Sequence, residues 1–398
     1  MSKQLTVCVV GCGDFARCFV PLFKAHPAVR KVYVCDLIPE RAAAYAKTFG
    51  TETVGSYEEA LKSKEIDCIA NFTQRHLHGP VVIQALKHGK NVYSAVPMAS
   101  EVEECQEIVS LVKQTGLTYM MGETCIYYTS SMFCREKYLS GEMGHFVYGE
   151  SQYYHDIAHF PPDFRKDLTS AGVPPFFYPT HSTAMLLNAT DSYVTRVTAM
   201  GYADREEDPY FRKDVNQWGN VLSNEFSLMR LANGGVARVN ECRRIAFKAP
   251  SSCVQAFYGT EGSYQFQNAR HLFYRKTGEG VTLEDVSDYI NPTAMTAHKN
   301  DPDFTVRVAN HEWQWDKRAP IQAREYERIP DSYKDLPNGH MASHQLLVDD
   351  FCTAAAANSL PRVHAWLAAR FTIPGLIAHQ SALQNGQPLD VPDCGMPE

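Results

Sequence analysis

The fold class follows from one segment near the start of the sequence, Leu5-Thr6-Val7-Cys8-Val9-Val10-Gly11-Cys12-Gly13-Asp14-Phe15-Ala16. Its first half is a mostly apolar run, which is typical of a parallel strand buried on both faces. Its second half is G-x-G-x-x-A, in which the glycines permit a tight turn and a close approach to a pyrophosphate, while Ala16 lets helix and strand pack closely. The helix that follows would direct its positive end at the phosphates. We therefore predict a dinucleotide-binding turn that includes Gly11, Gly13, Asp14 and Phe15.

A second apolar run, Val32–Cys35, ends in an acid that indicates which nucleotide is bound. Asp36 lies about 20 residues beyond the glycines, where a carboxylate accepts hydrogen bonds from the hydroxyls of an adenosine ribose. Because an acid at this position repels a 2′-phosphate, the sequence favours NAD over NADP. The alternative is an α/β domain that binds no nucleotide and has an ordinary glycine turn here.

Strand and helix patterns keep alternating through Cys68–Phe72, Val81–His88, Asn91–Tyr93 and Leu117–Met121. Such βαβ alternation predicts a parallel sheet. Residues that follow its strands lie at the carboxyl edge, where open α/β sheets bind ligands. We therefore assign Thr73, His78 and Pro97 to the cofactor side, with Glu123 at the same edge. A turn or helix-cap role is the alternative for each of them.

From His145 onward the pattern changes to long runs of alternating apolar and polar residues. These runs predict one largely antiparallel sheet over Phe146–Tyr154, Val194–Tyr202, Leu222–Leu231, Val236–Glu241, Val254–Tyr258 and Tyr264–Gln267. Helical patterns cover Ser182–Asn188, His344–Ala356 and Ala365–Leu383. We expect Pro374 to kink or break the last helix. We also expect residues 276–340, which are polar and interrupted by prolines, to form an irregular excursion or lid.

The length suits two domains, because 398 residues exceed one typical hydrophobic core. We predict an α/β protein with an N-terminal Rossmann dinucleotide-binding domain over residues 1–124. Residues 125–398 would form an α+β domain with a large, mainly antiparallel open sheet and C-terminal helices. Since an open sheet face commonly packs against a copy of itself, we expect a homo-oligomer, either a dimer or a tetramer.

Composition and charge exclude several classes of partner. A net charge of -7 gives no general attraction to nucleic acid or to an anionic membrane. The sequence has no apolar run long enough to span a bilayer and no basic-then-apolar leader. Its twelve cysteines are scattered without a C-x-x-C motif, which is typical of a reducing compartment. We therefore expect a cytoplasmic protein that acts on a small molecule.

The G-x-G-x-x-A domain, the following sheet domain and a histidine at a helix start together resemble the Gfo/Idh/MocA family of sugar and polyol dehydrogenases. Most members carry Glu-Lys-Pro after the strand equivalent to Asn91–Tyr93, and that lysine assists removal of the hydroxyl proton. Here the tripeptide is Ala95-Val96-Pro97, so the usual lysine is absent.

One subgroup of that family, the NAD-dependent glycosidases typified by bacterial α-N-acetylgalactosaminidases, also has valine before this proline. The segment Tyr178-Pro179-Thr180-His181 matches its Tyr-Pro-Thr-His motif, whose tyrosine and histidine line the sugar site. The segment Gly149–Asp156 is similar to its Glu-Gly-x-Tyr-x-His-Asp strand and places Tyr153 at a catalytic tyrosine. Gly122-Glu123 matches an acid that contacts sugar hydroxyls. The resemblance implies transient oxidation at C3, elimination across C1 and C2, addition of water and re-reduction.

Proton transfer assigns roles to the candidate catalytic residues. His181 would take the proton of the oxidised hydroxyl, because an imidazole titrates near neutral pH. Tyr178 and Tyr153 would move the C2 proton or polarise the carbonyl, although tyrosines on a half-buried strand often only pack. Glu123 would accept a sugar hydroxyl or act as a cap.

Further residues have competing interpretations. His155 and Asp156, together with His159 and His181, have the side chains of a metal site, but they also suit a pair that orients tyrosines, and we predict no metal. We place His155 and Arg243 among the substrate-binding residues, since a guanidinium can bind an anionic sugar; Arg243 and Arg244 would otherwise be solvated. The tryptophans Trp313 and Trp315 would stack on a sugar or pack between subunits.

Two alternatives to the glycosidase remain. A sugar dehydrogenase would use His181 or a tyrosine in place of the missing lysine. A catalytically silent nucleotide-binding protein would not need Asp36, Tyr178 and His181 together. Glycoside cleavage without accumulated NADH separates the glycosidase from the dehydrogenase.

Overall fold

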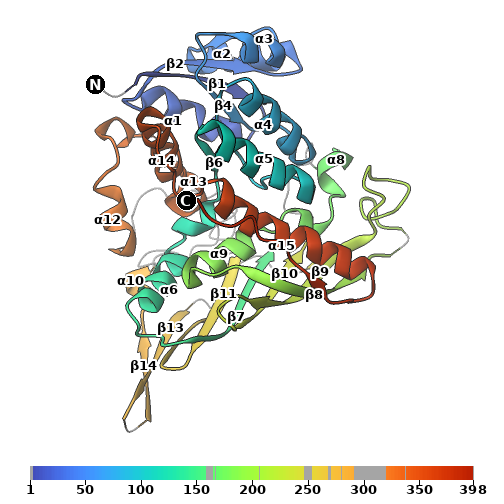
Figure 1. The fold of residues 1–398 in the computed structure, drawn as a ribbon, viewed down its shortest axis with the longest axis vertical. Helices are drawn as coiled ribbons and strands as arrows, with labels where there is room; N and C mark the ends of the chain where they lie inside the picture. Colours follow the sequence, from blue (N-terminus) through green and yellow to red (C-terminus); the bar gives the residue numbers. More distant parts are fainter. Residues whose placement is uncertain are drawn as a thin grey trace, which may run out of the picture.

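The computed structural model describes residues 3–157, 165, 167–205, 207–245, 253–267, 270–278, 280–290, 320–336 and 338–397. Two sheets organise these residues, one at each end of the molecule, with helices between them (Figure 1). The first sheet carries the glycine turn; the second carries Tyr153, and Tyr178 precedes the helix that packs on it.

The first sheet has six strands in the order β3-β2-β1-β4-β5-β6, and every described pair is parallel. The strands are β1 Leu5–Val10, β2 Val29–Cys35, β3 Glu52–Thr53, β4 Cys68–Asn71, β5 Asn91–Ser94 and β6 Tyr119–Met121. All residues of β1 are buried, as the apolar run predicts. The strand order reverses between β1 and β4, and ligands of such sheets bind in the crevice at this switch point. The predicted Rossmann domain is confirmed.

The second sheet has nine strands in the order β14-β13-β12-β11-β7-β10-β9-β8-β15. All of its described pairs are antiparallel except β7 with β10, so the predicted mainly antiparallel sheet is also confirmed. The strands are β7 Phe146–Tyr154, β8 Val194–Ala203, β9 Leu222–Leu231, β10 Val236–Cys242, β11 Cys253–Gly259, β12 Gly262–Gln267, β13 Arg270–Thr277, β14 Gly280–Asp285 and β15 Leu389–Asp390.

Helices cover both sheets and connect them. The α-helices are α1 Val20–Ala25, α2 Pro39–Phe49, α3 Tyr57–Lys62, α4 His78–Lys87, α5 Val102–Thr115, α6 Thr129–Leu139, α8 Leu168–Ala171, α9 Thr180–Thr190, α10 Ser287–Ile290, α12 Ala323–Tyr326, α13 Gly339–Ala342, α14 His344–Ala357 and α15 Ala365–Leu383. Single 3-10 turns are η1 Ala16–Cys18, η2 Arg75–Leu77, η3 Thr124–Tyr127, η5 Pro175–Phe177, η7 Pro320–Gln322 and η8 Asp331–Tyr333.

The C-terminal helices contact both halves of the molecule. Helix α15 lies between α5 and β8 (Figure 1), whereas α14 packs against α1 and β1. The division at residue 124 therefore stays a prediction, because the chain beyond it also covers part of the first sheet. Among the described residues, no helix combines the length and the apolar character needed to cross a bilayer.

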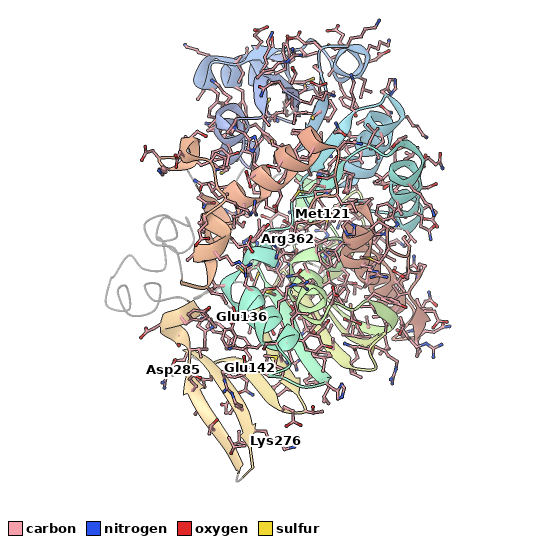
Figure 2. All side chains as sticks on the ribbon, turned by 60° about the vertical axis from the view of Figure 1, so that its left-hand side comes forward. Met121, Glu136, Glu142, Lys276, Asp285 and Arg362 are labelled. Carbon is pink, nitrogen blue, oxygen red and sulfur yellow. The ribbon has the colours of Figure 1, made fainter. Side chains whose placement is uncertain are left out.

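Two expectations about the second half are wrong in part: Pro374 does not break its helix, and the start of the expected excursion forms a regular hairpin. Helix α15 runs unbroken through Pro374, because it is buried against α5, α9 and β8 and this packing outweighs the lost backbone hydrogen bond. The described part of residues 276–340 contains the end of β13, all of β14, helices α10 and α12, the 3-10 turns η7 and η8, and the start of α13. Figure 2 shows Lys276 and Asp285 on this hairpin, which projects from one end of the sheet. Residues 291–319, with Trp313 and Trp315, lie outside the described part.

Candidate functional site

The glycine turn at the end of β1 is shaped by a close approach to β4. Gly11 has a φ of +93°, and a Cβ at this position would lie 2.6 Å from the carbonyl oxygen of Phe72. At Gly13, by contrast, a Cβ would meet nothing within 4 Å. Only glycine fits the first position without strain. The second leaves open space beside the backbone, which suits the pyrophosphate of a dinucleotide.

The carboxylate of Asp36 also holds the glycine turn in place through hydrogen bonds to backbone N–H groups. Its Oδ2 accepts a hydrogen bond from the Cys12 N–H at 2.7 Å, and its Oδ1 accepts one from the Ile38 N–H at 2.8 Å. A carboxylate has about four acceptor positions, so both oxygens keep capacity for ribose hydroxyls. The residues present therefore fit NAD.

The two residues after Gly13 have different surroundings. The Asp14 side chain is 94% exposed and pairs only loosely with Arg17, at 3.8 Å. The Phe15 ring packs edge-on against Phe19 and Phe72, so its side chain belongs to the core beneath the turn.

His78 joins the ends of β4 and β5. Its Nδ1 lies 2.7 Å from the carbonyl oxygen of Pro97, and its Nε2 lies 3.0 Å from that of Thr73. Burial lowers the pKa of His78 to about 4, against the opposing effect of the two carbonyls. Because His78 is only 1% exposed, we interpret it as a residue that positions the cofactor-side loops.

The candidate acid–base group is a chain of three side chains from two sheets. Glu123 follows β6, and His181 lies in the first turn of α9, which packs on β7. The Oε1 of Glu123 is 2.8 Å from Nδ1 of His181, whose Nε2 is 3.1 Å from the Tyr178 hydroxyl. In this arrangement Nδ1 donates to the carboxylate, and Nε2 accepts from the phenol.

Glu123 is fully buried, yet its carboxylate is held ionised. Burial raises the pKa of Glu123, but its interaction with His181 and the hydrogen bond from the Cys125 N–H outweigh burial, so the pKa lies below its ordinary value. With no exposed surface, Glu123 orients His181 in this structure instead of meeting a sugar hydroxyl directly.

Two tyrosines border His181. The ring centroid of Tyr153 lies 5.0 Å from that of His181 and 6.1 Å from that of Tyr178, and His155 stacks on Tyr153 at 5.3 Å. Burial raises the pKa of Tyr178 to about 12, against the opposing effect of Arg75, and burial also raises the pKa of Tyr153. Both phenols therefore keep their protons at neutral pH and can donate hydrogen bonds.

Arginines lie over both tyrosine rings. The Cζ of Arg243, just after β10, is 5.0 Å from the Tyr153 centroid, and the Cζ of Arg75, in η2, is 4.2 Å from the Tyr178 centroid. Arg243 also pairs with the buried Glu241 at 3.1 Å. Burial raises the pKa of Glu241 to about 8, although Arg243 opposes this.

Sequence reasoning did not assign a role to Arg75 or Glu241. Arg75 does lie in the segment after β4 that was placed on the cofactor side, and Glu241 ends the strand that precedes Arg243. The neighbouring Arg244 instead forms an ion pair with Asp208 at 2.6 Å. The two adjacent arginines therefore have separate roles, which their sequence does not reveal.

A set of possible metal ligands differs from the one considered from sequence. Glu123, Cys125 and His181 each offer a donor atom, and these atoms lie within 4.8 Å of one another. However, Oε1 of Glu123 already accepts N–H bonds from both other residues, which accounts for the cluster without an ion. His159 lies outside the described residues, and the absence of a metal stays a prediction.

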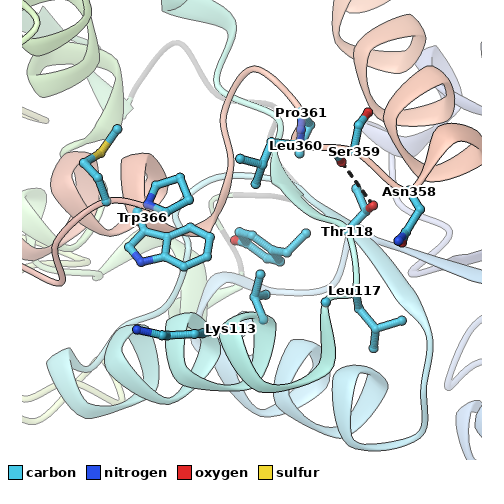
Figure 3. Close-up of a pocket in the computed structure, with 13 residues that line it drawn as sticks. Lys113, Leu117, Thr118, Asn358, Ser359, Leu360, Pro361 and Trp366 are labelled. Atoms are coloured by element: carbon cyan, nitrogen blue, oxygen red, sulfur yellow. Dashed lines mark hydrogen bonds between the residues drawn. The ribbon is translucent and has the colours of Figure 1, made fainter.

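A separate cavity of about 360 Å³ opens at the other end of β6 (Figure 3). It is lined by the end of α5, by Leu117 and Thr118, and by residues 358–361, with Trp366 at its side. The Thr118 hydroxyl donates to the Ser359 carbonyl at 3.4 Å. None of the predicted site residues lines this cavity.

Comparison with known proteins shows which family the N-terminal domain resembles. Residues 5–123 match the GFO_IDH_MocA family, described as "Oxidoreductase family, NAD-binding Rossmann fold". The match covers the N-terminal domain, which contains the six-stranded parallel sheet. The predicted family resemblance, enzyme class and NAD cofactor are therefore confirmed.

Individual family relatives cover nearly the whole chain. A "Glycosyl hydrolase family 109 protein" of Streptomyces niveus is 23% identical, and the alignment covers 98% of this chain and 77% of the relative. A levoglucosan dehydrogenase in complex with NADH and levoglucosan has a TM-score of 0.74 at 19% identity, covering 98% of this chain and 100% of that one. The myo-inositol 2-dehydrogenase of Lactobacillus plantarum has a TM-score of 0.68 at 15% identity, with 98% and 100% covered. The structural matches show that the fold is shared.

Proposed function

We propose that the protein is an NAD-dependent glycosidase that cleaves a small glycoside through transient oxidation at C3. The observation that carries this proposal is the hydrogen-bonded chain from Glu123 through His181 to Tyr178. Arg75, which follows β4 at the cofactor edge, stacks on Tyr178 and so brings that edge to the acid–base group. Similarity to the glycosyl hydrolase family 109 proteins over 98% of the chain supports the same activity.

Bound NAD would supply the reversible oxidation of the sugar carbon. The protein would supply the proton transfers. The Tyr178 hydroxyl donates to Nε2 of His181, so its oxygen is able to accept the proton of a sugar hydroxyl while its own proton moves to the imidazole. Glu123 then stabilises the imidazolium through Nδ1, as a buried carboxylate does for other catalytic histidines. No lysine is needed in this relay, which agrees with Val96 at the usual lysine position.

Tyr153 would act at the neighbouring carbons. Once C3 is a ketone, the proton on C2 becomes acidic and the substituent at C1 can leave by elimination. Because Tyr153 is protonated at neutral pH, it would donate its proton to the leaving group and take the proton from C2 in exchange, so that the step balances. Water would then add across C1 and C2, which returns a proton to C2. Return of the hydride from the bound cofactor to C3, with a proton to its oxygen, would complete hydrolysis without net oxidation, whereas the same return without water addition would give an unsaturated lyase product.

A sugar dehydrogenase is the second candidate. The same Tyr178–His181 pair would serve it, and the levoglucosan and inositol dehydrogenases share the fold across 98% of this chain. A dehydrogenase would release an oxidised sugar and accumulate NADH. A glycosidase would release the aglycone with no accumulation of NADH.

The deciding experiment is a panel of nitrophenyl glycosides assayed with and without added NAD. Nitrophenol release without NADH absorbance supports the glycosidase, and NADH absorbance without nitrophenol supports the dehydrogenase. Retention of NAD(H) by the purified protein, measured by chromatography after denaturation, would be a second support, because a redox-neutral cycle gains nothing from releasing the cofactor. Protein that purifies free of nicotinamide and binds NAD only weakly would count against the cycle.

We further propose that the enzyme works as a homodimer or homotetramer. Strand β9 alternates buried and exposed positions, and Phe226 and Leu228 are 41% and 49% exposed on its outer face. An apolar open sheet face suits contact with a second copy. Light scattering that gave a monomer at working concentrations would contradict this. The cytoplasmic location stays a prediction.

A further inference from the structure

Two arginine side chains from different parts of the fold converge on one tyrosine ring. The Cζ of Arg75 lies 4.2 Å from the Tyr178 centroid, and the Cζ of Arg243 lies 5.8 Å from the same centroid. Arg75 follows β4 in the first sheet, while Arg243 follows β10 in the second. Burial lowers the pKa of Arg75 against the opposing effect of Tyr178, and the charge of Arg243 also lowers it.

The nearby carboxylates lie behind this pair. Glu241, which binds Arg243, also accepts a hydrogen bond from the Ser182 hydroxyl, and Glu123 is bound to His181 on the side away from Tyr178. Both carboxylates are 0% exposed, whereas Arg75 and Tyr178 are half-buried. Arg243 is 5% exposed and donates to Glu241 and to the Cys242 carbonyl, so a ligand that reaches the two tyrosines would meet the half-buried Arg75 first.

Packing against the Tyr178 ring does not by itself explain why two positively charged side chains meet there. A guanidinium can stack on a ring and still direct its N–H groups at an oxyanion, and its planar fork matches a carboxylate. A shared anion would also remove the repulsion between the two groups.

We infer that the sugar bound at Tyr153 and Tyr178 carries an oxyanion, which Arg75 and Arg243 bind together. A carboxylate, as in a hexuronic acid, fits the guanidinium fork best, and a sugar phosphate has the same donor requirement. The inference rests on the proposed function, since that function places a sugar at these tyrosines.

The test is equilibrium binding by calorimetry to the NAD-loaded protein. The probes are methyl glucuronides of both anomeric configurations, the matching methyl glucosides and glucose 6-phosphate. We expect at least one glucuronide to bind about 10-fold more tightly than its glucoside, the gain of one charge-assisted contact. Arg243→Gln and Arg75→Gln should each reduce this preference to near equality. Arg238→Gln removes the same charge from the same strand β10, where Arg238 pairs with Glu150, and should keep it.

Equal affinity for the glucuronide and glucoside pairs and for glucose 6-phosphate in the wild type would overturn the inference. So would a preference that persists in both folded arginine variants. Tighter binding of glucose 6-phosphate than of the glucuronides, lost in the same variants, would support the inference with a phosphate as the anion. If Arg243→Gln does not fold, Arg75→Gln and the charge-retaining Arg75→Lys decide the question, because lysine keeps the charge but loses the fork.

Measurements of turnover with the same substrates test the anion site and the glycosidase activity independently of each other. Selective binding of the glucuronide together with accumulated NADH would keep the anion site and overturn the glycosidase. Cleavage of neutral and anionic glycosides at equal efficiency, without selective binding, would keep the glycosidase and overturn the anion site.

Discussion

Oε1 of Glu123, at the end of the first sheet, lies 2.8 Å from Nδ1 of His181, in the helix that covers the second. Glu123→Gln keeps the size of the side chain but removes its charge. We expect kcat to fall about 100-fold while KM and NAD affinity change little, because the carboxylate stabilises the protonated imidazole. Steady-state kinetics and NAD titration measure these quantities.

The matched control is Glu142→Gln, which changes a carboxylate that pairs with Lys137 and Arg275 beside the β13–β14 hairpin. Figure 2 shows Glu142 there, on the far part of the second sheet. It should leave kcat within experimental error. Equal losses in the two variants would remove Glu123 from the relay.

His181→Ala should lower turnover at least about 100-fold in a folded protein, the scale of positioned acid–base catalysis. Because Glu123 acts through His181, the double variant Glu123→Gln/His181→Ala should be no slower than His181→Ala alone. Circular dichroism and NAD retention check the fold. Additive losses would show that Glu123 acts independently of the imidazole.

Elimination predicts exchange at C2 of the sugar. In heavy water the released sugar should carry deuterium at C2, and thioglycosides should be cleaved, because expulsion from an enolate needs little acid assistance. Mass spectrometry and NMR of the product measure the label. Unlabelled product, inert thioglycosides and no isotope effect from C2- or C3-deuterated substrate would together leave no support for elimination.

Asp36→Ala should weaken NAD binding by about 1–3 kcal/mol, since it removes acceptors for the ribose and the bond to the Cys12 N–H. Asp14→Ala removes an exposed carboxylate from the same turn and serves as the control. Fluorescence titration with NAD gives both affinities. Unchanged affinity in Asp36→Ala would place the ribose elsewhere.

The lowered pKa of His78 predicts that the stability of the folded protein depends on pH. Its pKa in the folded protein is about 4, below the ordinary 6.5, so the stabilisation it gives is complete above about pH 6.5 and is lost as pH falls towards 4. The difference in unfolding free energy between wild type and His78→Gln should shrink by about 3 kcal/mol between about pH 7 and pH 4. Urea unfolding at several pH values measures it. His88→Gln, at an exposed histidine just after the same helix, should show no such shrinkage.

Local patterns predicted most of the fold because buried positions of strands and helices carry apolar residues at a regular spacing. The alternation that predicted Phe146–Tyr154 and Leu222–Leu231 gave the observed bounds of β7 and β9. The helix break predicted at Pro374 does not occur, because contacts with segments far away in the sequence outweigh the backbone hydrogen bond that the proline removes. The hairpin β13–β14 was missed although Val281 and Leu283 alternate with polar residues, because this alternation is short and β14 buries none of its residues.

The candidate site was predictable only in part, for a related reason. Tyr153, Tyr178, Glu123 and His181 were identified by motif resemblance, and the fold brings them together. The positions of Arg75 and Glu241 depend on how two sheets meet. Nothing within either segment indicates that Arg75 lies over Tyr178 or that Glu241 is buried behind Arg243.

The hydrogen-bonded chain from Glu123 through His181 to Tyr178 limits how parts of related proteins can be exchanged. Its carboxylate is inherited with the first sheet, and its imidazole and phenol are inherited with the helix over the second. A chimera that joins the first half of one relative to the second half of another would need matching members of the relay from both parents, and matching contacts of α14 and α15 with the first half. The two halves must therefore diverge together, and exchange of whole domains is not a short route to new sugar specificity in this protein.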